Sequence, residues 1–313
     1  MRPGYLDLPL QTLHEREREG WEMLRSCRLC PRQCQVNRLE GERGFCQTGS
    51  ATPIASYHLH FGEEQPLVGE RGSGTIFIAG CNLGCVFCQN FDVSRGAETA
   101  AQADPQQLAA IMLELQRHGA HNINLVTPTH VVPQILQALP HAIDAGLSLP
   151  LVYNCGGYEE VHTLALLEGI VDIYMPDLKF ADPDVAQRLA GARDYPERAG
   201  AAVREMQRQV GDLETDESGV ALRGLIVRHL LLPGELAGTR DWLAFLAREI
   251  SQRVYLNLMD QYRPCGQAKS YPELCSSISR DELHWAREEA HSQGLTRLDR
   301  RESPNLRDLL RFL

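Results

Sequence analysis

Hydrophobic positions along this chain gather in six short runs, which alternate with longer stretches that have the period of an amphipathic helix. The runs are rich in Val, Ile and Leu, and they occupy residues 75–80, 123–128, 149–154, 171–178, 225–233 and 253–260. Short runs without polar alternation are typical of parallel strands, which are buried on both faces. The pattern therefore predicts an α/β fold with six βα units and helices outside a parallel sheet.

Two of the intervening stretches begin with helix-capping residues. Asp104 stands before Pro105, which suits an N-cap followed by proline at the first helical position. Ser279 is followed by Glu282 at the spacing of a capping box. Such local signals do not set the order of the strands, so two architectures satisfy the pattern: a doubly wound sheet, or an open barrel of about six strands.

The chain divides by composition into three parts. Residues 1–70 hold a polar, cysteine-rich metal-binding segment and a connector, and residues 71–262 hold the six runs. Residues 263–313 predict a C-terminal helical extension. The stretch HLHFGEEQPLVGERGSG (58–74) is glycine-rich and acidic, so we expect a solvated loop there. The alternative is that His58, His60, Glu63 and Glu64 line the mouth of the predicted site.

Charge and composition narrow the class of protein. The 313 residues are 43% hydrophobic and 23% charged, as in an ordinary soluble domain, and a net charge of −10 disfavours binding to a nucleic acid backbone. The N-terminus lacks the apolar region of a signal peptide, and no run of about eighteen apolar residues occurs. We therefore expect a cytoplasmic protein with no nucleic acid partner and no membrane segment.

Seven of the ten cysteines form two tight clusters, which favours metal binding over disulfides in a reducing compartment. The stretch GCNLGCVFCQN places Cys81, Cys85 and Cys88 at the end of the first run, and active sites of parallel α/β folds lie at the carboxyl ends of strands. Three thiolates suit a [4Fe–4S] cluster that keeps one iron open. The alternatives are zinc held by three thiolates and a histidine, or three buried small side chains.

The second cluster can close a metal site completely, as an auxiliary [4Fe–4S] cluster or as tetrahedral zinc. It consists of Cys27, Cys30, Cys34 and Cys46. Its CxxCPxxC spacing is closer to ferredoxin-like loops than to zinc fingers, but the sequence leaves both metals open. Because the segment is poor in apolar residues, the metal would supply folding free energy.

The motif CxxxCxxC, with Phe87 just before its last cysteine, resembles the signature of the radical S-adenosylmethionine (SAM) superfamily. Longer stretches look like those of the PflX family, relatives of the pyruvate formate-lyase activating enzymes. They are GEEQPLVGERGSGTIFIAGCNLGCVFCQN, VTPTH, NCGGYE, MPDLKF, HLLLPGE and NLMDQYRP. The resemblance runs from Cys27 to about Leu295 and implies a partial (β/α)6 barrel of the radical SAM type.

The resemblance implies an enzyme that carries a [4Fe–4S] cluster and binds SAM at its open iron. The reduced cluster would cleave SAM to methionine and a 5′-deoxyadenosyl radical, which abstracts hydrogen from a substrate. In the activating enzymes that substrate is a glycyl residue of a partner enzyme, so an oxidoreductase or activase acting on a protein, a peptide or a small molecule is implied. The electron would come from a donor such as flavodoxin or ferredoxin.

The resemblance also implies contacts between this chain and SAM. Phe87 would lie near the adenine, and Asp177 and Lys179 match a DxK motif near the methionyl group. A lysine ammonium group would also pair favourably with the carboxylate of a bound ligand, whatever the family. The alternative for Asp177 and Lys179 is a weak surface ion pair at a strand end.

Further SAM contacts are expected at the ends of other strands. The second run lacks the usual GGE-like end, and Thr127, Thr129 and His130 occupy that place. We expect these three residues, and Asn154 at the end of the third run, to contact SAM. His229 matches a basic position on the fifth strand; the alternative is a hydrogen-bonded core histidine.

A different class of function also accounts for the two cysteine clusters. A non-catalytic electron-transfer or metal-binding protein would use them as redox or scaffold sites. The two hypotheses differ in one measurable property, because only the enzyme cleaves SAM.

Overall fold

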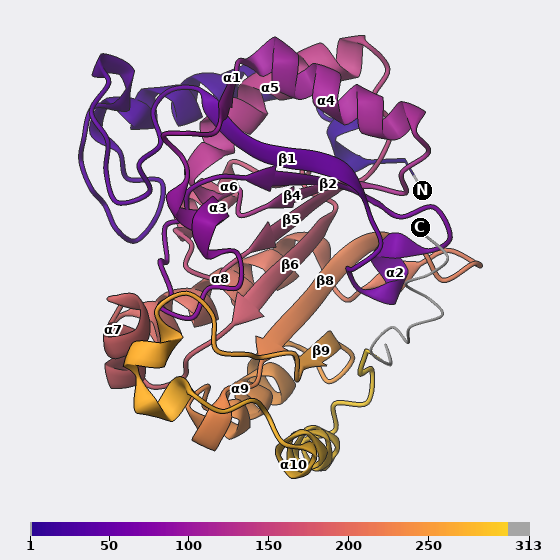
Figure 1. The fold of residues 1–313 in the computed structure, drawn as a ribbon. Helices are drawn as coiled ribbons and strands as arrows, with labels where there is room; N and C mark the ends of the chain where they lie inside the picture. The colour runs from indigo at the N-terminus through magenta and orange to yellow at the C-terminus, as the bar shows by residue number, and fades with distance from the viewer. Residues whose placement is uncertain (1, 300–313) are drawn as a thin grey trace.

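The computed structural model describes residues 2–299, and its centre is one sheet with six parallel strands (Figure 1). The parallel strands are β2 (Ser73–Ile78), β4 (Ile123–Val126), β5 (Leu151–Cys155), β6 (Ile173–Leu178), β8 (Ala221–Leu230) and β9 (Tyr255–Met259). Each strand overlaps one of the six predicted runs, so the predicted α/β pattern with a mostly parallel sheet is confirmed.

The order of the strands decides between the two architectures. The parallel strands follow one another in chain order from β2 to β9, whereas a doubly wound sheet reverses its order at a switch point. Right-handed connections between strands in this order place the helices on one side of the sheet. Figure 1 shows them around one side of a curved sheet, and because β2 pairs with β1 on its outer edge, β2 and β9 do not join to close a cylinder.

Helices cover the sheet and the ends of its strands. The α-helices are α1 (Leu10–Glu22), α2 (Gln65–Val68), α3 (Phe91–Arg95), α4 (Pro105–Arg117), α5 (Val132–Asp144), α6 (Val161–Ala165), α7 (Pro183–Ala190), α8 (Tyr195–Val210), α9 (Thr239–Phe245) and α10 (Arg280–Ser292). Helix α9 continues as a π-helical turn over Leu246–Ile250. Within residues 2–299, no helix has the length and apolar character needed to cross a bilayer.

Both predicted helix starts are confirmed. Asp104 caps α4 and Ser279 caps α10, and in each case the third helical residue returns a hydrogen bond to the backbone of the cap. Helix α10 lies in the predicted C-terminal extension, of which residues 300–313 lie outside the described part of the chain.

The solvated loop expected at residues 58–74 is wrong. Its start belongs to β1 (Thr52–His60), which pairs antiparallel with β2, and α2 follows. β1 also pairs with β3 (Ala101–Ala103), and β7 (Glu214–Thr215) lies beside β8. β1 is held by backbone hydrogen bonds to both neighbours and needs no apolar run, so composition did not reveal it.

The interior of the partial barrel is closed at the amino-terminal ends of its strands by an apolar plug. Leu67 of α2 packs there with inward-facing residues of the central strands, among them Val152, Ile173 and Ile226. Because side chains alternate between the faces of a strand, their neighbours Tyr153 and Tyr174 point outward into the main core under the helices. Toward the carboxyl ends of the strands, the inward-facing positions beyond the plug include the polar residues Asn154, Asp177 and Arg228.

Candidate functional site

The loop that follows β2 carries the first group of cysteines, and it lies tightly against the N-terminal segment. Gly80 and Gly84 have φ angles of +84° and +70°, a conformation that glycine adopts without strain. A Cβ atom on Gly80 would stand 2.7 Å from the carbonyl oxygen of Cys46. The loop therefore requires glycine at this position.

The thiols of this loop act on one another electrostatically. Burial raises the pKa of the Cys85 thiol to about 12, and the thiols of Cys81 and Cys88 add to that rise. The nearby Lys179 ammonium acts in the opposite direction. The backbone N–H of Leu83 donates to Cys81 Sγ over 3.4 Å. Three thiols and one ammonium group thus share a site, and metal binding would deprotonate the thiols.

A buried ion-pair network lies inside the barrel and is centred on Asp177. Lys179 Nζ donates to its Oδ2 over 2.5 Å, and Arg228 Nε donates to its Oδ1 over 2.6 Å. The three side chains are 11–16% exposed. Burial disfavours the charged carboxylate, but the two cations outweigh it and hold the pKa of Asp177 below its usual value. The alternative of a surface ion pair is therefore wrong.

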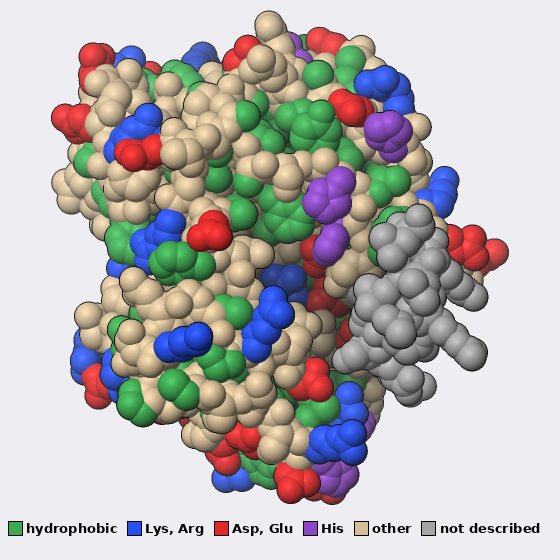
Figure 2. Space-filling model, viewed as in Figure 1, with side chains coloured by type: hydrophobic (Ala, Val, Ile, Leu, Met, Phe, Trp, Pro, Cys, Tyr) green, Lys and Arg blue, Asp and Glu red, His purple; other side chains and the backbone are tan. Residues whose placement is uncertain are grey.

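Arg228 extends this network to other strands and to the connector. It donates to Asn154 Oδ1 over 2.6 Å and pairs with Glu63 at 3.5 Å. Burial raises the pKa of Glu63 to about 7, while Arg228 opposes the rise and Glu64 adds to it. Glu64 accepts a hydrogen bond from Asn257. Figure 2 shows a hollow with basic and acidic side chains deep within it, in the region where β6 and β8 run in Figure 1.

Thr127 and Thr129 lie at the carboxyl end of β4, in different surroundings. Thr127 has a φ of +61°, which is unusual for a β-branched residue, and its N–H donates to the Asn154 carbonyl. Strained backbone of this kind occurs at binding sites. Thr129 is fully buried and donates to Glu159 over 2.6 Å. Thr127 and Asn154 thus lie together, while the Thr129 hydroxyl is engaged within the protein.

Phe87 and His229 are both buried. Phe87 makes edge-to-face contacts with Phe180 and Tyr262. The ring nitrogens of His229 lie 2.8 Å from the Leu178 carbonyl and 2.9 Å from the Thr239 hydroxyl. Both nitrogens have protein partners, as expected for a hydrogen-bonded core histidine. Its contact with SAM stays a prediction.

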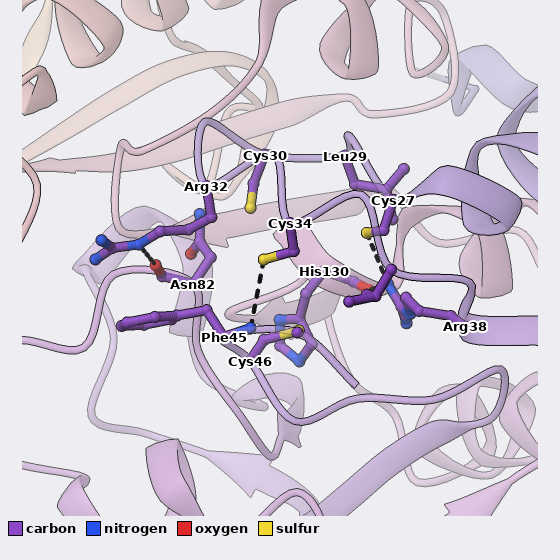
Figure 3. A pocket seen from close by; sticks show the side chains of 12 residues that line it. Cys27, Leu29, Cys30, Arg32, Cys34, Arg38, Phe45, Cys46, Asn82 and His130 are labelled. Atoms are coloured by element: carbon purple, nitrogen blue, oxygen red, sulfur yellow. Dashed lines mark hydrogen bonds between the residues drawn. The ribbon is translucent and has the colours of Figure 1, made fainter. Parts of the chain in front are cut away.

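The second group of cysteines lines one pocket in the N-terminal segment (Figure 3). The four thiols share it with Arg32, Arg38, Phe45, Asn82 and His130. The structure thus places His130 in the wall of this pocket, away from the barrel interior where the sequence prediction put it. The backbone N–H of Phe45 donates to Cys34 Sγ over 3.4 Å.

Several residues of the site were missed from the sequence. Arg228 was overlooked because its neighbour His229 matched a family position; the signal was its charge within an apolar strand. For Glu63 and Glu64 the sequence favoured a solvated loop over a place at the mouth of the site, but they are 8% and 3% exposed. Glu159 gave no signal, because its partners Thr129 and Tyr153 come from separate strands.

A barrel with a three-cysteine loop at the carboxyl end of its first parallel strand defines a radical SAM protein, and the comparisons agree. The sequence profile of the radical SAM superfamily matches residues 75–215. The chain is 31% identical over 304 residues to an uncharacterized protein, MJ0674, of Methanocaldococcus jannaschii, which covers 94% of this chain and 81% of the relative. Another uncharacterized protein of that organism, MJ0808, is 32% identical over 82 residues, 22% of this chain and 24% of the relative. The chain belongs to the radical SAM superfamily.

Membership of this superfamily implies a [4Fe–4S] cluster and SAM, and the residues fit both groups. Cys81, Cys85 and Cys88 come from one loop and supply three thiolates for three irons. Lys179 lies beside them and can pair with a carboxylate. Within residues 2–299, no three His, Cys, Asp or Glu side chains converge on a point suited to a single ion.

Proposed function

We propose that this radical SAM enzyme abstracts hydrogen from a glycyl residue of a partner enzyme, as the activating enzymes related to the PflX family do. The observation that carries the radical SAM part is the three-thiol loop placed beside the buried Asp177–Lys179 pair. The side of the barrel is open, and Figure 2 shows a hollow there, which suits a substrate presented on a polypeptide.

The chemistry of the reaction comes from the bound groups, and the chain positions them. When bound at Cys81, Cys85 and Cys88, the cluster would supply one electron for the cleavage of SAM, and SAM would supply the 5′-deoxyadenosyl radical that abstracts hydrogen. Lys179 binds the methionyl carboxylate, and Asp177 orients the lysine. The Asp177 carboxylate raises the pKa of Lys179 against the effects of burial and of Arg228, so the lysine keeps its charge in a buried site. Arg228 holds Asp177 from the other side.

Other residues shape the SAM site in this proposal. Phe87, enclosed by Phe180 and Tyr262, forms the wall toward the adenine. The strained backbone at Thr127, next to Asn154, takes the place of the GGE-like contact to the SAM amino group. The remaining parts are a flavodoxin or ferredoxin as electron donor, a cytoplasmic location, and a second metal centre, either an auxiliary [4Fe–4S] cluster or zinc, at the N-terminal cysteines.

Reductive cleavage of SAM tests the proposed enzyme. Anaerobically reconstituted protein with SAM and dithionite is expected to yield 5′-deoxyadenosine and methionine, measured by liquid chromatography. Cys85→Ala should lower the yield at least about a hundredfold, because one iron loses its thiolate. Cys275→Ala is the matched control, since Cys275 is exposed and outside both cysteine clusters.

Two outcomes would change the proposal. SAM that stays intact in the wild-type reaction would contradict the enzyme and favour a non-catalytic electron-transfer or metal-binding protein. For the substrate, a short peptide with α-deuterated glycine should pass deuterium into 5′-deoxyadenosine. Cleavage of SAM without deuterium transfer from such a peptide would count against a glycyl substrate while leaving the enzyme intact.

A further inference from the structure

A fully buried arginine lies beside the four N-terminal cysteines. The side chain of Arg38 is 1% exposed, and it donates to the backbone carbonyls of Gly49 and His130. Its Nη1 also lies 3.9 Å from Cys27 Sγ. Among residues 2–299, no carboxylate stands within ion-pair distance of this guanidinium, so its charge has only carbonyls and thiols around it.

A buried guanidinium without a counter-charge is costly even when carbonyls accept its hydrogen bonds, because they offset the loss of hydration only in part. The groups near Arg38 that can become anionic are the thiols. Four thiolates bound to a metal centre carry net negative charge, and they would balance Arg38.

His130 gives a second indication of a ligand in this pocket. Its Nε2 lies 2.9 Å from the Ala79 carbonyl, which can only accept, so Nε2 carries the hydrogen. Nδ1 is then a buried acceptor without a hydrogen-bond partner. Burial lowers the pKa of His130 to about 4, so the ring is neutral at pH 7. Buried acceptors are rarely left without a partner, so the protein by itself does not complete this pocket.

The arrangement of the thiols distinguishes a cluster from zinc. Tetrahedral zinc, about 2.3 Å from each sulfur, draws its four thiolates toward one point. Here the four thiols surround a common pocket, but no three of them converge on one ion position within the described residues. A [4Fe–4S] cube needs this wider spacing, because each thiolate binds a different iron. Figure 3 shows the sulfur atoms spread around the pocket.

The pocket lies directly against the loop of Cys81. Asn82 lines it and is the residue that follows Cys81 in the chain. From the N-terminal segment, Arg32 donates to the carbonyls of Asn82 and Leu83 over 2.9 and 2.8 Å. The Arg32 guanidinium also stacks on the Phe45 ring at 3.9 Å. Any metal centre in the pocket is thus a near neighbour of the three-cysteine site.

We propose that the second metal centre is a [4Fe–4S] cluster held by four thiolates, and that Arg38 supplies the buried positive charge that balances it. The cluster ligands are Cys27, Cys30, Cys34 and Cys46. The proposal deepens the second metal centre of the proposed function, and it selects iron over zinc. Arg38 is a positioning residue, which acts on the cluster through charge and hydrogen bonds to its ligands.

Metal content tests the site itself. Wild-type protein reconstituted with iron and sulfide should hold about eight iron atoms per chain, and Cys34→Ala combined with Cys46→Ala should hold about four. Cys85→Ala is the converse variant: it should lose SAM cleavage while the N-terminal iron stays. Zinc in place of iron in protein purified anaerobically, or an unchanged iron content in the double variant, would overturn the proposal without touching SAM cleavage.

The role of Arg38 is tested by redox titration followed by electron paramagnetic resonance. Arg38→Gln should shift the signal of the second cluster to lower potential, because a positive charge beside a cluster favours its reduced, more negative form. Arg38→Lys should restore most of the shift. Arg28→Gln, an exposed arginine in the same segment, is the control and should leave the potential unchanged. Equal potentials in Arg38→Gln and the wild type would overturn the charge-balancing role.

Proximity of the two centres gives a readout that does not depend on activity. Fully reduced wild-type protein should show broadened signals from magnetic coupling between two neighbouring clusters. The double cysteine variant should show one uncoupled signal from the three-cysteine site. Two uncoupled signals in the wild type would contradict the placement of the second cluster.

Discussion

Individual charged side chains are buried on both sides of the cysteine loop, and each is balanced differently. Asp177 is held between Lys179 and Arg228. Arg38 has thiols rather than a carboxylate nearby. Glu159 accepts hydrogen bonds from the hydroxyls of Thr129 and Tyr153, and among residues 2–299 no cation lies within ion-pair distance of its carboxylate. Glu159 is therefore the residue from which a pH effect on stability is expected.

Burial raises the pKa of Glu159 from 4.5 to about 7, although its two hydrogen bonds oppose the rise. The folded protein therefore binds the Glu159 proton more tightly than the unfolded chain does. The stability that this proton contributes is fully present below pH 4.5 and is lost as the pH rises through 7. The loss amounts to about 3 kcal/mol. Glu159→Gln has no titrating carboxyl at this position, so its free energy of unfolding should lack this loss with rising pH.

Urea unfolding at pH 5 and pH 8 measures this difference. From pH 5 to pH 8 the free energy of unfolding of the wild type should fall further than that of Glu159→Gln. Glu98→Gln removes an exposed carboxylate and should follow the wild type. A parallel change in wild type and Glu159→Gln would show that the Glu159 carboxyl titrates in its ordinary range.

At the level of secondary structure, helix α4 is stabilised at its N-terminus by a capping box. Asp104 Oδ1 accepts from the Gln107 N–H over 2.8 Å, and Gln107 Oε1 accepts from the Asp104 N–H over 2.9 Å. The helix packs against α5 and against β1, beside the strand that leads into the cysteine loop. Its stability therefore bears on the position of that strand.

Removal of this cap should destabilise the protein by a predictable amount. Asp104→Ala leaves the first backbone N–H groups of α4 without acceptors, and we expect a loss of about 1 kcal/mol in the free energy of unfolding. Thermal and urea unfolding of the reconstituted protein measure it. Gln106→Ala, at an exposed position in the same turn, should stay within about 0.5 kcal/mol of the wild type. Equal losses in both variants would mean that the cap contributes nothing.

In the molecule as a whole, the cysteine-bearing part of the N-terminal segment, residues 27–46, is attached to the barrel mainly by polar contacts and has only a small core, whereas α1 before it packs on α5. That core contains Leu24, Cys27 and Leu29. Arg32 and Arg38 hold the segment to the loops after β2 and β4 through backbone carbonyls. So little apolar burial cannot stabilise a segment of this length, and metal binding would provide the rest.

Metal removal should therefore loosen this segment selectively. After anaerobic chelation of iron, amides of residues 27–46 should lose protection in hydrogen exchange, while those of β5 in the central sheet keep it. In Cys85→Ala, which damages only the other site, the segment should stay protected. Unchanged protection after complete iron removal would show that the segment folds without metal.

Local sequence was sufficient for the features that depend on neighbours in the chain. The six runs located the six parallel strands, because buried strands need continuous apolar residues. Asp104 and Ser279 located two helix starts, because a cap bonds to its own helix. The spacing of Cys81, Cys85 and Cys88 indicated the radical SAM class, since all three thiols come from one loop.

Contacts between distant segments were decided only by the tertiary structure. Arg228 and Asp177 meet because β8 and β6 are adjacent in register, while alternation turns His229 outward. Glu63 and Glu64 became buried because β1 and α2 bring the connector to the barrel, and His130 joined the four-cysteine pocket through the turn after β4. Burial and charge pairing depend on what lies across space, and a linear pattern records only what lies along the chain.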